Sequence, residues 1–314
     1  MKPCYDKIPS LNFHDFLSKN DNKKQNFIYS LGKAYQQLGF VTIKNHNLDE
    51  QFIKKLFNVY HQFFNLSEET KNRYYDEKLC GERGYTGKMR ECAKGFKEPD
   101  LKEFFHVGQE GQRKYPVNIW PSEIPDFKKI NIKAYQALEN IGFSILEALT
   151  SFLNLPHNFL KEKVTHGNSV LRAIHYFPIQ NNHPTNAVRA AEHCDINFIT
   201  VLMSASAEGL QVKRHDGKWI DVKPDPDTII INVGDMLSRM TNNRLKSTVH
   251  RVINPSLEKM HEPRYSIPFF MHPKPDVNLA SLESCVDRAH PKLYKDITAG
   301  EFLYQRLVEN GLKG

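Results

Sequence analysis

The spacing of apolar residues divides the chain into a helical first half and a strand-rich second half. Large apolar side chains recur every three to four positions at 52–64 and again at 134–152, which is the repeat of a helix with one buried face. The longer of these helices should end before Pro156, and a final helix is expected at 299–312. These segments predict amphipathic helices that pack on a core.

The second half consists of short apolar runs rich in β-branched and aromatic residues. Turn sequences such as His215-Asp216-Gly217 separate these runs. Strands are expected at 171–177, 197–203, 210–212, 219–222, 228–233, 249–253 and 264–271. Closely spaced strands of this kind are typical of a β-sandwich or barrel. Residues 80–100, which hold four glycines and no clean periodicity, are expected to form a loop.

Length and composition are those of a globular enzyme. The 314 residues are 40% apolar and 11% aromatic, and no repeat or linker marks a second domain, so a single domain is expected over 1–314. The formal charge of +7 is spread along the chain, which argues against a nucleic-acid stripe and is compatible with an anionic small-molecule substrate.

The same sequence features suggest a cellular location. Five widely spaced cysteines without a Cys-x-x-Cys motif favour a reducing compartment. The first residues lack the apolar core of a signal peptide, and no run is long enough to span a membrane. We therefore expect a cytoplasmic monomer that binds neither nucleic acid nor membrane.

The strongest chemical signal is His193-Cys194-Asp195, followed by His250. In an extended strand, residues two positions apart point to the same side, so His193 and Asp195 can face one metal ion while Cys194 faces away. His250 would arrive from a distant strand. Two imidazoles and one carboxylate can occupy one face of an octahedral ion and leave three positions open, as ferrous iron needs for binding a substrate and dioxygen together.

A second signal follows 14 residues after His250, at Arg264-Tyr265-Ser266. In a strand, Arg264 and Ser266 share a face, so a planar guanidinium and a hydroxyl can grip one carboxylate. A His-x-Asp pair alone occurs by chance in many proteins. The added Arg264-Tyr265-Ser266 motif is what makes a metal enzyme the better interpretation.

In order and spacing, these motifs resemble the signature of the 2-oxoglutarate/Fe(II) oxygenases, in the branch that includes isopenicillin N synthase and plant flavonoid and hormone dioxygenases. Leu38-Gly39-Phe40-Val41 and Gly234-Asp235-Met236-Leu237 are also similar to this family. The resemblance implies a mostly β fold with flanking helices, a double-stranded β-helix (jelly roll) with N-terminal helices packed on one sheet. It implies a helix-rich region at 1–165, a jelly-roll core at 166–275 and a C-terminal extension at 276–314.

The resemblance also implies the chemistry. His193, Asp195 and His250 would bind Fe(II), and Arg264 and Ser266 would bind the far carboxylate of the co-substrate 2-oxoglutarate. O2 would take the last position on the metal. A small-molecule substrate would be hydroxylated, desaturated or cyclised, with release of succinate and CO2. Plant members often have Asn-Tyr-Tyr-Pro where this chain has His175-Tyr176-Phe177-Pro178, so a tyrosine contact to the co-substrate is not carried over.

The substrate side of the pocket is expected in and after the glycine-broken segment, where members of the family often build it. Arginines there could instead be solvated, and the aromatics could be ordinary core residues. The candidates for substrate contact are Tyr85, Arg90, Phe104, Phe105, His106, Arg172 and His175.

Three alternatives stay open from the sequence. An isopenicillin N synthase-like oxidase would use the same iron ligands without 2-oxoglutarate, and its Arg264 and Ser266 would hold a substrate carboxylate. A zinc hydrolase could use two histidines and an aspartate, but it would leave Arg264 and Ser266 unexplained. A non-catalytic jelly-roll binding protein would not consume oxygen with any ligand.

Overall fold

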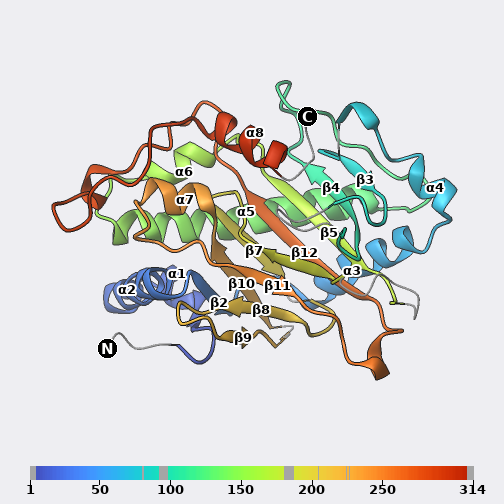
Figure 1. The fold of residues 1–314 in the computed structure, drawn as a ribbon, viewed down its shortest axis with the longest axis horizontal. Coiled ribbons are helices and arrows are strands. Elements are labelled where there is room, and N and C mark those ends of the chain that lie inside the picture. Colours follow the sequence, from blue (N-terminus) through green and yellow to red (C-terminus); the bar gives the residue numbers. More distant parts are fainter. Residues whose placement is uncertain are drawn as a thin grey trace.

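Two β-sheets lie face to face, and helices cover the outer side of the larger sheet (Figure 1). The computed structural model describes residues 5–79, 81–91, 98–179, 187–203, 205–223, 225 and 227–309. All statements about the structure refer to these residues.

The larger sheet has eight strands and the smaller has four. In spatial order the larger sheet consists of β1 (Ser10–Asn12), β2 (Phe40–Lys44), β10 (Thr228–Val233), β7 (Ile199–Met203), β12 (Arg264–Met271), β5 (Val170–Tyr176), β4 (Glu103–Gly108) and β3 (Gly84–Thr86). The smaller sheet consists of β6 (Ala190–His193), β11 (His250–Val252), β8 (Leu210–Lys213) and β9 (Trp219–Asp221). Neighbouring strands are antiparallel except β1 and β2, which are parallel.

The longest helix, α5, runs across the outer face of the larger sheet and contacts β7, β12 and β4. The helices are α1 (Phe13–Leu17), α2 (Asp21–Gln37), α3 (Glu50–Phe64), α4 (Glu68–Asn72), α5 (Phe127–Phe152), α6 (Phe159–Val164), α7 (Asp235–Met240) and α8 (Ala299–Glu309). Short 3-10 turns lie at Glu77–Leu79, Leu257–Lys259 and Glu283–Cys285.

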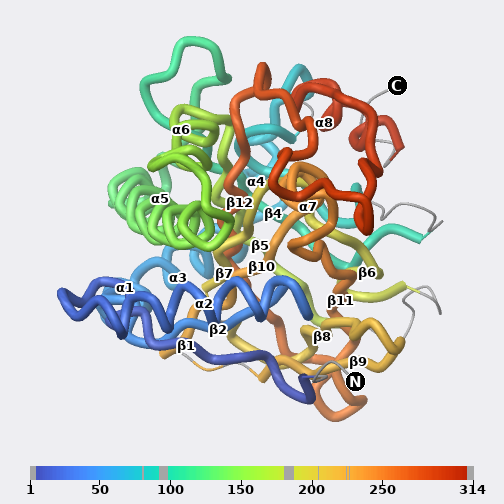
Figure 2. The backbone as a smooth tube through the Cα atoms, turned by 90° about the vertical axis from the view of Figure 1, so that its left-hand side faces the viewer, coloured from blue at the N-terminus to red at the C-terminus, as the bar shows by residue number. Residues whose placement is uncertain are grey.

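The apolar core has two main layers, one on each side of the larger sheet. The outer layer joins the helices to the sheet and includes Leu138 of α5 and Phe269 of β12. The inner layer lies between the two sheets and joins Ile174 of the larger sheet to Val212 and Val252 of the smaller sheet. Figure 2 shows this order of helices, larger sheet and smaller sheet from the side. Because strand side chains alternate between the two faces, each residue of the larger sheet belongs to one layer or the other.

The fold confirms the jelly roll with helices on one sheet. The seven predicted strands are present with ends shifted by at most two residues, and the two amphipathic helices correspond to α3 and α5. The predicted final helix is α8, and its last expected residues lie outside the described part.

One prediction was wrong in part. Residues 80–100 were expected to form a loop, but Gly84–Thr86 is strand β3, which pairs with β4. Residues 80 and 92–97 lie outside the described part. Strands β1 to β4 all come from the region expected to be helix-rich, yet they make up half of the eight-stranded sheet.

Among the described residues, no helix combines the length and apolar character needed to cross a membrane.

Candidate active site

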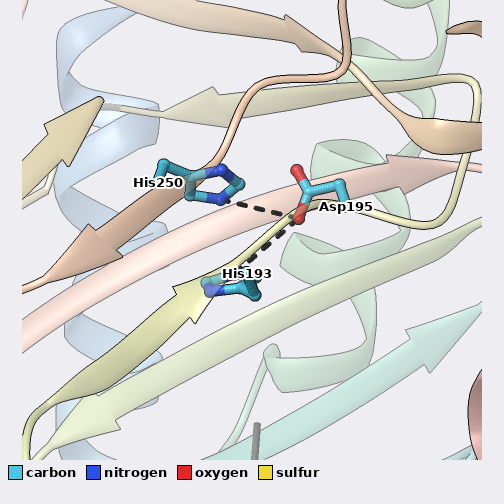
Figure 3. A group of neighbouring side chains, drawn as sticks. All are labelled: His193, Asp195 and His250. Atoms are coloured by element: carbon cyan, nitrogen blue, oxygen red, sulfur yellow. Dashed lines mark ion pairs between the residues drawn. The ribbon is translucent and has the colours of Figure 1, made fainter. Parts of the chain in front are cut away.

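The two histidines of the predicted metal site meet across the smaller sheet. His193 ends β6, His250 begins β11, and the two residues are direct cross-strand partners with ring centroids 4.3 Å apart. Asp195 Oδ1 lies 3.7 Å from His250 Nε2 and 4.0 Å from His193 Nε2 (Figure 3). The three side chains thus offer one ligand atom each within 4.8 Å of one another.

A β-bulge contributes to this arrangement. His250 pairs with His193, whereas Val252 pairs with Ala190, so three steps along β6 match two along β11. A bulge re-aims the side chain next to it. Asp195 lies beyond the end of β6, so the predicted alternation along one continuous strand does not account for its position.

Hydrogen bonds set the orientation of both imidazoles. His193 Nδ1 lies 2.7 Å from the Ala191 carbonyl oxygen, and His250 Nδ1 lies 3.2 Å from that of Thr248. A carbonyl oxygen only accepts, so each Nδ1 carries the proton and donates it. In the neutral form of each ring, Nε2 then carries the lone pair on the side of Asp195, as a metal ligand requires.

Among the described residues, side-chain donors hold the Asp195 carboxylate through Oδ2. Oδ2 accepts hydrogen bonds from Thr200 Oγ1 at 2.6 Å and from Asn232 Nδ2 at 2.7 Å, and Oδ1 faces the histidines. The backbone of this segment is fixed by the Asp235 N–H, which donates to the Asp195 carbonyl at 2.7 Å. Gly234, the residue before Asp235, lies close to the backbone of Asn197. A Cβ at this position would lie 2.2 Å from the Asn197 carbonyl oxygen, so a glycine is needed here.

The protonation states also suit a cation. Burial, followed by the charge of His250, lowers the pKa of His193 to about 4. Burial alone would raise the pKa of Asp195, but the two histidines, Asn232 and Thr200 together lower it. Burial raises the pKa of the intervening Cys194 thiol to about 12, so it stays protonated near pH 7. Two imidazoles that offer Nε2 and one carboxylate form a donor set that fits Fe(II).

Arg264 and Ser266 lie on the inner face of β12. They pair with Tyr176 and Ile174, two residues of the inner core layer, and both are buried. Arg264 Nε donates to the Ala207 carbonyl at 3.1 Å, while its Nη1 is buried without a hydrogen-bond partner among the described residues. A buried guanidinium nitrogen without an acceptor is costly, and the carboxylate of a ligand would satisfy it.

Three of the seven predicted substrate residues share this inner face: Phe104, His106 and Arg172. The Arg172 guanidinium lies 4.2 Å from the centroid of the Phe104 ring, and its Nε donates to His106 Nε2 at 2.5 Å. His106 Nδ1 in turn donates to the Gly81 carbonyl at 2.6 Å. Burial, followed by the charge of Arg172, lowers the pKa of His106 well below its usual range, so His106 is neutral.

Three others, Tyr85, Phe105 and His175, lie on the outer face and are not placed to contact a substrate at the metal. The Tyr85 and Phe105 rings pack against Phe63 of α3, and the His175 ring packs against Phe64. Strand alternation across β3, β4 and β5 places the three side chains on this face.

The seventh predicted residue, Arg90, follows β3. Its guanidinium lies 4.4 Å from the centroid of the Tyr75 ring. This contact does not bring it to the three candidate ligands.

His272 was missed from the sequence. It continues the alternation of Arg264, Ser266 and Phe270 along the inner face just beyond β12. Its Nδ1 is buried without a hydrogen-bond partner among the described residues, and burial lowers its pKa to about 4. The charges of Asp195 and Arg172 both act on this ring. The alternation that identified Arg264 and Ser266 could have identified it.

Two family models match the chain. The model for the 2OG-Fe(II) oxygenase superfamily matches residues 167–273, and the one for the N-terminal region of the non-haem dioxygenases in morphine synthesis matches residues 8–123. The first range contains all three candidate metal ligands.

Among relatives, the proline hydroxylase buaE of Petromyces alliaceus is 31% identical, over 96% of this chain and 99% of its own length. A protein of Caulobacter crescentus assigned to the 2OG-Fe(II) oxygenase family has a structure that is 42% identical, with a TM-score of 0.85, over 96% of this chain and 98% of that one. A full-length Neurospora crassa protein, whose structure is a complex with alpha-KG and thymine, is 29% identical, with a TM-score of 0.86, over 96% of each chain.

These comparisons, on a jelly roll that brings together two histidines and an aspartate, define a non-haem iron oxygenase. The chain belongs to the 2OG-Fe(II) oxygenase superfamily. It is an Fe(II)- and 2-oxoglutarate-dependent dioxygenase.

Proposed function

We propose that His193, Asp195 and His250 bind Fe(II), that Arg264 and Ser266 bind the far carboxylate of 2-oxoglutarate, and that the enzyme oxidises a C–H bond of an uncharged small molecule. The observation that carries the assignment of 2-oxoglutarate is the buried Arg264 guanidinium, whose Nη1 has no hydrogen-bond partner among the described residues. Fe(II), when bound, supplies the site at which O2 is activated while 2-oxoglutarate is converted to succinate and CO2.

The residues of the chain contribute position and a dry environment. Thr200 and Asn232 hold Asp195 through one oxygen and leave the other for the metal. Arg264 and Ser266 orient the co-substrate from the inner face of β12. The product can be hydroxylated, desaturated or cyclised, depending on which C–H bond the pocket presents.

The charge balance of the inner face favours an uncharged substrate. Arg172 Nη1 donates to Glu91 at 3.1 Å, and Lys102 Nζ lies 2.7 Å from both Glu91 and Asp100. Two cations are thus matched by two carboxylates, and His106 and His272 are neutral near pH 7. An anionic substrate, which the net charge of the chain left open, would find no spare cation in this cluster.

The aromatic side chains around Arg172 on the inner face add to this preference for an uncharged substrate. The Arg172 guanidinium lies between the rings of Phe104 and Phe270, 4.2 Å and 5.3 Å from their centroids. Two aromatic rings beside a guanidinium, together with the unpartnered Nδ1 of His272 among the described residues, suit a planar ring with hydrogen-bonding groups. Thymine, which the Neurospora crassa relative holds together with alpha-KG, is a molecule of this class.

The test is anaerobic titration of the Fe(II)-loaded protein with 2-oxoglutarate, followed by a succinate-release screen under oxygen. Binding of 2-oxoglutarate should give the weak visible charge-transfer band of a keto-acid chelate. The screen should pair uncharged heterocycles, thymine among them, with carboxylated analogues, and the uncharged members should stimulate succinate release. Oxygen consumption indifferent to 2-oxoglutarate would favour the isopenicillin N synthase-like oxidase instead.

We also propose that residues 1–314 act as one cytoplasmic, monomeric oxygenase domain. Support comes from β1 to β4, which complete the sheet of the catalytic core, and from the widely spaced cysteines of the sequence. Sedimentation of the purified chain would test the oligomeric state.

A further inference from the structure

A second buried guanidinium lies at the same end of the site as Arg264. Arg189 precedes β6 and is 1% exposed, and Arg264, at the beginning of β12, is 2% exposed. Arg189 Nη2 donates to the carbonyl oxygen of Glu262 at 2.7 Å. Glu262 is two residues before Arg264, so both guanidinium groups lie where the chain enters β12.

Neither guanidinium is fully satisfied by the protein. Arg189 Nε and Arg264 Nη1 are both buried without a hydrogen-bond partner in the described part of the chain. Arg189 Nη2 donates to the Glu262 carbonyl oxygen, and Arg264 Nε donates to the Ala207 carbonyl oxygen. Neither of these two acceptors carries a net charge. Buried cations are normally paired with an anion, and unpaired donors cost free energy.

The electrostatics indicate a deficit of negative charge. Burial lowers the pKa of Arg189 to about 10, and the positive charge of Arg264 adds to this shift. Tyr176 and Glu262 oppose it, but the Glu262 residue is exposed and its charge is therefore screened. The same Tyr176 lies on Arg264, with the guanidinium 4.9 Å from the centroid of its ring. Two buried like charges that lie near each other favour an anion between or beside them.

We propose that Arg189 is a second cationic contact for the far carboxylate of 2-oxoglutarate, so that this carboxylate is bound by a pair of guanidinium groups. The inference rests on the proposed function. It adds a co-substrate-binding residue that the Arg264-x-Ser266 motif does not include. A structural role, in which Arg189 only ties β6 to the Glu262 carbonyl, is the alternative that the experiment must separate.

The experiment measures binding rather than turnover. Calorimetric titration of the Fe(II)-loaded full-length protein under argon compares 2-oxoglutarate with 2-oxopentanoate, which has the same keto-acid end and chain length but no far carboxylate. The ratio of the two affinities isolates what the far carboxylate contributes. The proteins are the wild type, Arg189→Met, Arg189→Lys, Arg264→Met and the control Arg83→Met.

Arg83 provides a matched control. It is also fully buried, its Nε also lacks a hydrogen-bond partner among the described residues, and its Nη2 donates to Asn168 at 2.8 Å. Its guanidinium lies against Gly108, at the end of β4. Its loss should therefore cost stability without changing the affinity ratio.

Arg189→Met should weaken 2-oxoglutarate about ten- to hundredfold, which is the usual worth of a hydrogen bond to a charged group, and should leave 2-oxopentanoate unchanged. Arg189→Lys keeps the charge without the planar fork and should weaken 2-oxoglutarate severalfold. If Arg189→Met is too unstable to titrate, Arg189→Lys decides.

The inference is overturned if the Arg189 variants keep the affinity ratio of the wild type. This includes an equal loss of affinity for both keto acids, which marks a structural role. If Arg264→Met alone lowers the ratio, the proposed function stands and the inference fails. If the wild type binds no 2-oxoglutarate, both fail.

Discussion

Thr200 offers a sharp test of how the protein prepares Asp195 for a metal. Its Oγ1 donates to Asp195 Oδ2 at 2.6 Å, and its side chain is buried in β7. Thr200→Val keeps the shape of the side chain and removes this hydrogen bond, which leaves Asn232 as the remaining side-chain donor to Oδ2. Asn197 Nδ2 loses an acceptor but keeps the Ile199 carbonyl at 3.1 Å.

The expected effect follows from the charge on the acceptor. A hydrogen bond to a carboxylate is worth roughly 1.5–3 kcal/mol, and loss of such a partner of a metal ligand typically costs 10- to 100-fold in metal affinity. Because the Thr200 hydroxyl helps to lower the pKa of Asp195, the variant should also raise that pKa. The loss of Fe(II) affinity should therefore be larger at lower pH, where protons compete with the metal.

The assay is anaerobic Fe(II) titration in competition with a coloured chelator, at two pH values. Thr150→Val is the matched control, since Thr150 is equally buried at 3% exposure and donates to the Leu146 carbonyl within α5 at 2.7 Å. The control should lose stability but keep its Fe(II) affinity. An Fe(II) dissociation constant for Thr200→Val within twofold of the wild type would refute the reasoning, and so would an equal loss in Thr150→Val.

Three further outcomes are expected. Asp195→Ala should abolish Fe(II) binding and turnover while the circular dichroism of the fold persists, because the facial donor set loses its only charged member. Arg264→Lys should raise the Michaelis constant for 2-oxoglutarate by roughly one to three orders of magnitude, since a point charge lacks the planar fork, and iron affinity should stay within error. Burial lowers the pKa of His272 to about 4, so as pH falls below about 6.5 the unfolded chain takes up a proton that the folded protein does not. The free energy of unfolding of the metal-free protein should therefore fall between about pH 6.5 and 4, by up to about 3 kcal/mol from this residue, and His272→Asn should show a shallower fall in urea titrations.

The parts of the fold that were predicted from sequence are those in which one side of each element is apolar. Strand β10 is mostly apolar and was predicted with its observed ends, whereas the apolar stripe of helix α5 was recognised only from residue 134, seven residues after the helix begins. Strand β4 was not predicted, because it buries Glu103 and His106 among its aromatics and so shows no clear period. Buried polar residues with partners on other elements break the pattern on which sequence-based prediction depends.

The candidate metal ligands were selected by residue type and order, but the way in which they converge was not predicted. The bulge between Ala190 and His193, and the position of Asp195 beyond β6, depend on long-range pairing with β11 that local sequence does not encode. The partners of Asp195 were also unpredicted, because Asn232 lies 37 positions away and meets it only after β7 and β10 pair.

The predicted substrate residues that lie on the outer face explain how β12 is held from behind. Tyr265, between Arg264 and Ser266, points to the outer face and stacks on the His175 ring at 4.7 Å and 11°. The Nδ1 atom of His175 lies 2.7 Å from Glu103, whose carboxylate also accepts hydrogen bonds from Lys71 at 2.8 Å and Tyr85 at 2.6 Å. For the proposed carboxylate site, a strand that presents Arg264 and Ser266 in a fixed register gains from this buried network on its other face, because rigid support holds both side chains in place. Candidates adjacent in sequence to binding residues can therefore be part of the support rather than of the pocket.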